Sequence, residues 1–191
     1  MRTQVEAALA LAREHAYIQQ WAWGTVLHGW ADTDQTAGIT QMRQGLDTLL
    51  TIGTVLFRPY LLALCAEGHG AVGQCAEGLH ILDEALGLVE NNRQRLHEAE
   101  LYRLRGELLL QQSVSDEQQA EASFRQALDI ARHQQAKSWE LRATMSLARL
   151  WQHQGKGAAA RELLAPVYGW FTEGFDTADL QEAKALLDVL A

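Results

Sequence analysis

The sequence predicts an all-α fold: a right-handed α-solenoid of stacked antiparallel helix hairpins, with about four repeats of 40–42 residues and a terminal capping helix. Three observations lead to this prediction. Small residues recur at a fixed interval, polar breaks separate segments of helical length, and the 191 residues include only two prolines. Because proline interrupts the interior of a helix, a chain with so few can be helical along most of its length.

Two sets of small or apolar residues mark the repeat. They are Gly45, Ala85, Ala127 and Val167 in the second helix of each repeat, and Val26, Ala66, Gly106 and Ala148 in the first helix. The first set is spaced by 40, 42 and 40 residues, and the second by 40, 40 and 42. A two-helix hairpin cannot bury its own apolar face, so neighbouring hairpins must stack, and small residues let their helices approach closely.

These two sets divide the chain into one solenoid domain with a partial repeat, four full repeats and a capping helix. The ranges, in order, are 1–15, 16–54, 55–92, 93–134, 135–174 and 175–191. The first range holds a second-type helix without a first helix, so it predicts either a fragment of a longer solenoid or an amphipathic cap. We expect Ser115 or Asp116 to cap the helix that starts near Glu117, and Thr177 or Asp176 to open the final helix.

The pattern within a repeat resembles the tetratricopeptide repeat (TPR). The first helix has a small residue and an aromatic residue or leucine. The second helix has a small residue, then a large one after three intervening residues, and another small one after two more. The third copy has the typical set of Gly106, Leu109, Ala120, Phe124 and Ala127. The length departs from that family, since about 34 residues is usual for this repeat.

Longer repeats of this kind resemble the C-terminal TPR-like regions of large bacterial signalling ATPases, including relatives of the maltose-regulon activator and of adenylate/guanylate cyclase proteins. The stretches that carry this resemblance are 29–31, 41–46, 58–60, 99–104, 138–151 and 166–180. It implies a regulatory, protein-binding domain of a larger bacterial protein.

Composition argues against several classes of function. The net charge of -8 disfavours nucleic acid as the partner, since such binders carry a basic stripe. No run of 18 apolar residues could span a membrane, and Glu6, Arg13 and Glu14 argue against a signal peptide. Cys65 and Cys75 are the only cysteines, so we expect reduced thiols in a cytoplasmic protein.

No motif in the sequence predicts an enzyme, a cofactor or a metal ion. Residues 68–73 have G-x-G-x-x-G spacing, but they are expected at the end of a helix and in its turn, not after a strand. Cys65, His69, Cys75 and His80 could in principle bind zinc, but inward-facing repeat positions favour a packed cysteine and histidine. Acid pairs such as Glu98 and Glu100 are expected on a solvated helix face.

The predicted binding surface is the concave groove lined by the first helix of each repeat. Its residues are Trp23, Leu27, Tyr60, Ala63, Glu67, Glu100, Arg103, Glu107, Arg142, Met145 and Arg149. Two alternatives stay open from sequence. The cluster of Trp21, Trp23 and Trp30 is either binding surface or core, and the stretch 98–107 is either groove or a solvated face with internal ion pairs.

Three functions remain compatible with these observations. The leading hypothesis is reversible docking of a protein segment, a peptide or a neighbouring domain into the groove. The second is a small-ligand sensor that controls an attached ATPase or cyclase, for which an enclosed polar and aromatic pocket is needed. The third is a homodimer formed through the apolar ends of the solenoid.

Overall fold

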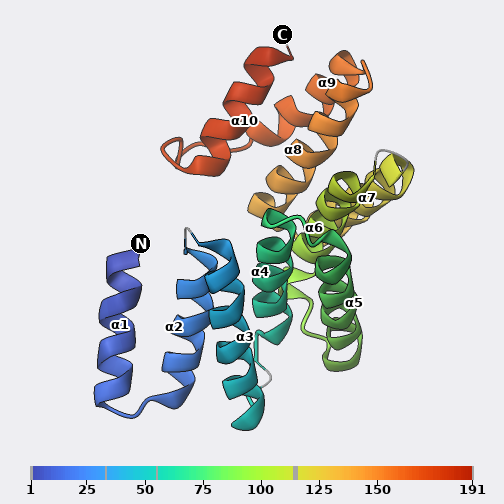
Figure 1. Cartoon of the computed structure of the whole chain (residues 1–191). Helices are drawn as coiled ribbons and strands as arrows, with labels where there is room; N and C mark the ends of the chain where they lie inside the picture. Colours follow the sequence, from blue (N-terminus) through green and yellow to red (C-terminus); the bar gives the residue numbers. More distant parts are fainter. Residues whose placement is uncertain (1, 33, 55, 114–115, 191) are drawn as a thin grey trace. The chain divides into compact units, whose positions relative to one another are not determined.

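The computed structural model describes residues 2–32, 34–54, 56–113 and 116–190, although not the side chains of residues 2 and 3. Throughout these ranges the chain forms helices joined by short connections, with no β-strand. Figure 1 shows the helices following one another in antiparallel pairs, as predicted. Contacts divide the chain into two compact units, Met1–Arg95 and Leu96–Ala191, called unit 1 and unit 2 below.

Unit 1 is built from five α-helices. They are α1 (Arg2–Glu14), α2 (Ile18–Trp30), α3 (Gln35–Thr51), α4 (Arg58–Ala71) and α5 (Cys75–Asn92). The pairs α2–α3 and α4–α5 each form a hairpin, and α1 packs against α2.

Unit 2 follows the same plan. It contains the 3₁₀ turn η1 (Arg95–His97), whose first residue ends unit 1, and then α6 (Glu98–Gln112), α7 (Glu117–His133), α8 (Lys137–His153), α9 (Gly157–Tyr168) and α10 (Ala178–Val189). The pairs α6–α7 and α8–α9 form hairpins, and α10 packs against α8 and α9. Each of the four predicted repeat ranges therefore contains one hairpin.

The small residues of the repeat lie where helices approach most closely. A Cβ atom at Gly45 of α3 would stand 2.6 Å from the carbonyl oxygen of Ala22 in α2. Gly29 and Gly38 face each other across the same hairpin, so that a Cβ on either would overlap the other's carbonyl oxygen. In unit 2, a Cβ at Gly106 would overlap the ring of Phe124, which is fully buried. Larger side chains at these positions would force the paired helices apart.

Most turns between helices use a residue in the left-handed region. Gly73 and Gly155 have φ of +77° and +75°, and the next residue donates its N–H to a carbonyl five residues back. This is the Schellman arrangement that satisfies the last carbonyls of a helix. Ala16 and Gln135 hold the same arrangement at φ of +54° and +55° without being glycine.

The expected helix caps are only partly present. Asp34 caps α3, because its carboxylate accepts from the N–H groups of Thr36 and Ala37, both at 3.1 Å. Asp116 precedes α7 but its side chain makes no capping bond, so that alternative is wrong, and the other candidate, Ser115, lies outside the described residues. Thr177 precedes α10, and its hydroxyl donates backwards to the carbonyl oxygen of Gly174 at 2.7 Å.

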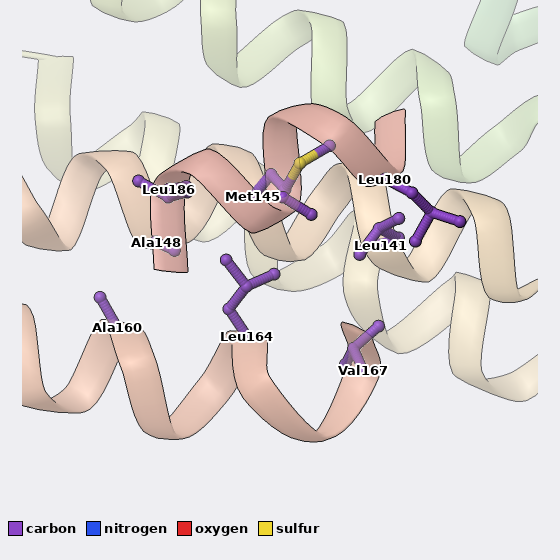
Figure 2. Packing of buried hydrophobic residues seen from close by; sticks show 9 residues of the cluster. Leu141, Met145, Ala148, Ala160, Leu164, Val167, Leu180 and Leu186 are labelled. Carbon is purple, nitrogen blue, oxygen red and sulfur yellow. The ribbon is translucent and has the colours of Figure 1, made fainter. Parts of the chain in front are cut away.

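The predicted capping helix α10 closes the core of unit 2. Figure 2 shows Ala160, Leu164 and Val167 pointing from α9 to one side, where they meet residues of α8 and α10. Leu180 and Leu186 of α10 are buried in this cluster. No helix in the described part of the chain is both long and apolar enough to cross a membrane.

Candidate interaction faces of the two units

The predicted groove residues lie on α2 and α4 in unit 1 and on α6 and α8 in unit 2. We call Trp23, Leu27, Tyr60, Ala63 and Glu67 the unit 1 face. We call Glu100, Arg103, Glu107, Arg142, Met145 and Arg149 the unit 2 face. Within each unit the two first-type helices contact each other, so each face is a continuous part of its unit.

Aromatic side chains dominate the unit 1 face. Trp23 is half-buried and meets the ring of Phe57 edge-on, with centroids 5.6 Å apart. The indole N–H of Trp30 donates to the carboxylate of Glu67 at 2.7 Å, which joins α2 to α4. Sequence reasoning named Glu67 but missed this bond, because nothing in a single sequence pairs residues that are 37 positions apart.

The tryptophan cluster of unit 1 belongs largely to the core. Trp21, Trp23 and Trp30 are all partly buried and pack against the cluster that contains Val26, Met42 and Leu61. Leu27 and Tyr60 pack against the same cluster. All three side chains nevertheless remain partly exposed.

Two apolar residues of the predicted groove are buried in the core, in addition to Glu100 and Arg103 of the ion pair described below. Ala63 is 1% exposed and Met145 is 3% exposed. Met145 lies in the core cluster between α8, α9 and α10, labelled in Figure 2. The repeat pattern in the sequence placed both residues on the groove side. However, α4 and α8 are packed around most of their circumference, because long runs of consecutive residues are buried in both helices.

A buried ion pair forms the centre of the unit 2 face. The guanidinium of Arg103 donates from Nε and from Nη2 to the two carboxylate oxygens of Glu100, both at 2.8 Å. The side chains are only 11% and 7% exposed. This two-point geometry fixes both side chains and is the strongest form of the arginine–carboxylate contact. The stretch 98–107 is therefore not a solvated helix face, since Glu98, Glu100 and Arg103 are buried.

Further polar contacts connect α6 to α8. Arg142 of α8 reaches the carboxylate of Glu100 at 3.1 Å. The hydroxyl of Ser146 donates to Glu107 at 2.6 Å, and Arg103 also reaches Glu107 at 3.3 Å. Ser146 was not predicted; its small size resembles a packing position in sequence and gave no signal of a polar role.

A second line of contacts connects α8 to α10. Arg149 pairs with Glu182 at 2.9 Å, and Arg142 lies 4.0 Å from Asp179. These groups are more exposed, with Arg149 at 42% and Glu182 at 57%. The unit 2 face thus grades from a buried pair to exposed charges that have partners but remain accessible to a second molecule.

Burial and charge also set the ionisation of Glu140, which lies at the start of α8. Burial alone would raise the pKa of its carboxyl. Hydrogen bonds from Lys137 at 2.6 Å and from Arg132 at 3.1 Å outweigh this and hold the pKa of Glu140 below its usual value. The carboxylate therefore stays charged and ties the end of α7 to α8.

The residues considered for metal and nucleotide chemistry lie within helices and turns. Cys65 and Cys75 are buried free thiols, and burial raises the pKa of Cys65 to about 12 although the charge of Arg43 opposes the shift. His69 is buried in α4 and bonds Gln74 at 2.7 Å. Among the described residues, no three histidine, cysteine or acidic side chains are grouped to hold a metal ion. The glycine-rich stretch 68–73 spans the end of α4 and its turn.

A cavity that sequence reasoning missed lies between α1, α2 and α3 of unit 1. Its volume is about 490 Å³. The polar side chains in its wall are Glu6, Arg13, Thr25, His28, Gln41 and Gln44, together with the indole of Trp21. They come from three helices, and only the tertiary arrangement brings them together.

Comparison with known proteins bears on the fold. No family model matches the chain. An uncharacterised protein of Rhizobium meliloti (strain 1021) is 28% identical over 152 residues, which cover 78% of this chain but only 15% of that protein. Two crystal structures of nearly identical TPR-like repeats from a putative kinesin light chain of Podosopora anserina also match. Their TM-scores are 0.60 and 0.58, at 16% and 17% identity, and the matches cover 99% and 100% of this chain and 85% and 86% of theirs.

These similarities define the class of protein. The chain is a TPR-like repeat domain, which confirms the predicted fold and the resemblance to the tetratricopeptide repeat. The finer resemblance to bacterial signalling ATPases and cyclase-linked regulators stays a prediction.

Proposed function

We propose that this chain is a protein-docking module that binds a peptide or a neighbouring domain through the faces of its first-type helices. The observation that carries the proposal is the unit 2 face, where the buried Glu100 holds Arg142 and where the accessible Arg149 is held by its own partner, Glu182. Charges fixed in advance lose little side-chain entropy when a partner arrives, and they select partners by electrostatic complementarity.

The wider setting that we propose is a regulatory part of a larger bacterial signalling or transcription-regulating protein in the cytoplasm. The match to one short portion of a long Rhizobium meliloti protein supports a domain within a larger chain. The free cysteines support a reducing compartment. In that setting the docking partner is a segment of another protein or another domain of the same chain.

Site-specific crosslinking tests the docking proposal. A photoreactive residue at Arg149 or Glu107 should capture one partner in bacterial cells, while the same residue at the exposed Gln126 of α7 should not. The captured partner is then purified and its affinity measured directly. Arg149→Glu should weaken binding about tenfold, and Arg149→Glu with Glu182→Arg, which restores the internal pair with reversed polarity, should fold normally. Unchanged affinity for both variants would contradict the proposal.

A second candidate function, small-ligand sensing, is favoured by the cavity between α1, α2 and α3. Its wall combines the charged, amide and aromatic groups expected of a ligand site, although the pocket is partly open and not enclosed. A thermal-shift screen against metabolites tests it, because a ligand that binds only the folded state raises the unfolding temperature. The absence of any such ligand would leave protein docking as the function.

A further inference from the structure

The cavity of unit 1 is walled by one face of each of three helices. In α1 the lining residues are Glu6, Leu9, Ala10 and Arg13, at the spacing of a single helical face. α2 contributes Trp21 and α3 contributes Gln44, among others. The cavity is therefore a partly open pocket bordered by three helices and not a dent in one helix.

One end of the cavity is negative. His28 of α2 bonds the side-chain oxygen of Gln41 at 2.7 Å, and its other ring nitrogen lies 3.7 Å from the carboxylate of Glu6. Glu6 is about half exposed, and a carboxylate can accept from several donors at once. This end can accept hydrogen bonds from a cationic nitrogen.

The other end is positive and lies at the corner between α1 and α2. The guanidinium of Arg13 stands over the ring of Trp21, 5.8 Å from its centre. Gln44 of α3 also lines the cavity. In the described part of the chain, Arg13 forms no ion pair with a carboxylate and the side-chain amide of Gln44 forms no hydrogen bond, which leaves planar donors for a carboxylate.

The two charges are seven residues apart on the same wall. At 1.5 Å per residue, Glu6 and Arg13 are about 10 Å apart along the axis of α1. A ligand of similar length can therefore bridge their two side chains. Leu9 and Ala10 lie between Glu6 and Arg13 on α1 and give this wall an apolar middle. A ligand that matches this wall has a carboxylate, a short apolar chain and a cationic nitrogen.

We propose that the cavity between α1, α2 and α3 binds a small linear zwitterion, with its carboxylate at Arg13 and its cationic nitrogen at Glu6. This inference rests on the second candidate function and specifies the class of ligand. It is independent of protein docking, which uses other faces of the molecule.

Three probes of equal chain length test this proposal: 6-aminohexanoate, hexanoate and hexylamine. We expect 6-aminohexanoate to bind the 191-residue chain at least about tenfold more tightly than either singly charged probe, measured by titration calorimetry and ligand-observed NMR. Equal binding of hexanoate would overturn the zwitterion assignment in favour of a simple carboxylate, and equal binding of hexylamine would overturn it in favour of a simple cation.

Charge-neutral variants test the two named contacts. Arg13→Gln and Glu6→Gln should each weaken 6-aminohexanoate binding about tenfold, because each removes one charge-assisted contact. Arg161→Gln, an exposed arginine of α9 in unit 2, is the matched control and should bind like the wild type. Circular dichroism before and after thermal unfolding establishes that the variants fold.

Two results would contradict the proposal. Binding that is unchanged in both Arg13→Gln and Glu6→Gln would place the ligand elsewhere. No binding of any of the three probes would refute the zwitterion class. If a different metabolite then raises the unfolding temperature, sensing survives and only the ligand class fails; if none does, the sensing function fails with it.

Discussion

Both units pack the first helices of neighbouring repeats against each other, but the side chains that make these contacts differ. In unit 1, α2 and α4 are joined mainly by aromatic and aliphatic side chains, with one hydrogen bond from Trp30 to Glu67. In unit 2, Arg142 and Ser146 of α8 contact Glu100 and Glu107 of α6, beside the buried Arg103–Glu100 pair within α6, and Arg142 also approaches Asp179 of α10. The same repeat architecture therefore accommodates either apolar or charged contacts between the first helices of neighbouring repeats.

The difference has an energetic consequence. Apolar contact is non-directional and loses stability in small steps as side chains are shortened. A buried ion pair costs desolvation energy and repays it only while both partners are in place, so removing one leaves an uncompensated charge. We expect unit 2 to be the more sensitive to single polar substitutions and the more precisely fixed in geometry.

The largest effect is expected at Arg103. Arg103→Met removes the guanidinium and leaves Glu100 buried with Arg142 as its remaining partner, so unit 2 should lose about 3 kcal/mol of unfolding free energy. Hydrogen exchange measured by mass spectrometry resolves this loss to peptides of 96–191. Arg149→Met, at an exposed pair, should cost less than about 1 kcal/mol. Similar losses for both variants would remove the distinction between buried and exposed pairs.

A smaller effect is expected at the corresponding contact of unit 1. Trp30→Phe keeps most of the ring and deletes the donor to Glu67, so unit 1 should lose about 1 kcal/mol. The same hydrogen-exchange measurement, read in peptides of 1–95, checks this value. Trp170→Phe in unit 2 is the control, since that ring is 57% exposed and should change stability little. A loss near 3 kcal/mol at Trp30 would mean that unit 1 also depends on a polar contact.

The stability of unit 2 should depend on pH through the carboxyl group of Glu140. Its pKa is lower in the folded state than the ordinary value of 4.5, so the folded state is favoured when the carboxyl is ionised. This stabilisation is fully present above the unfolded pKa and is lost as pH falls through the folded pKa. The stability difference between wild type and Glu140→Gln should therefore shrink between pH 6 and pH 3 in urea titrations. A difference that stays constant with pH would contradict this assignment.

The smallest effect is expected at the turns that both units share. Gln135→Gly in unit 2 and Ala16→Gly in unit 1 relieve the left-handed strain of a side chain, so each should stabilise its unit by about 0.5 kcal/mol, after the entropy cost of glycine. Gly155→Ala should destabilise unit 2 by a similar or larger amount, because the backbone there has φ of +75°, which is unfavourable for a residue with a side chain. Thermal unfolding of the three variants checks the signs. Destabilisation by both glycine substitutions would show that these side chains make compensating contacts.

The sequence by itself determined the fold class and the periodic small residues that mark it. Small residues such as Gly45 and Gly106 are needed wherever helices approach within the reach of a Cβ atom, so their spacing reports the repeat directly. The positions of the turns follow from glycine and polar residues in the same way. These are local or strictly periodic properties, which a single chain displays without an alignment.

Only the tertiary structure decided which predicted face residues are accessible and which groups meet. Met145 lies at a groove position by register but is buried, because α9 and α10 cover the same side of α8. The pair of Arg142 with Glu100 and the cavity shared by Arg13, Trp21 and Gln44 join residues far apart in sequence. Such contacts depend on the rotation and separation of packed helices. Periodicity identifies which side of a helix is apolar, but it does not determine which side chains its neighbours bring within bonding distance.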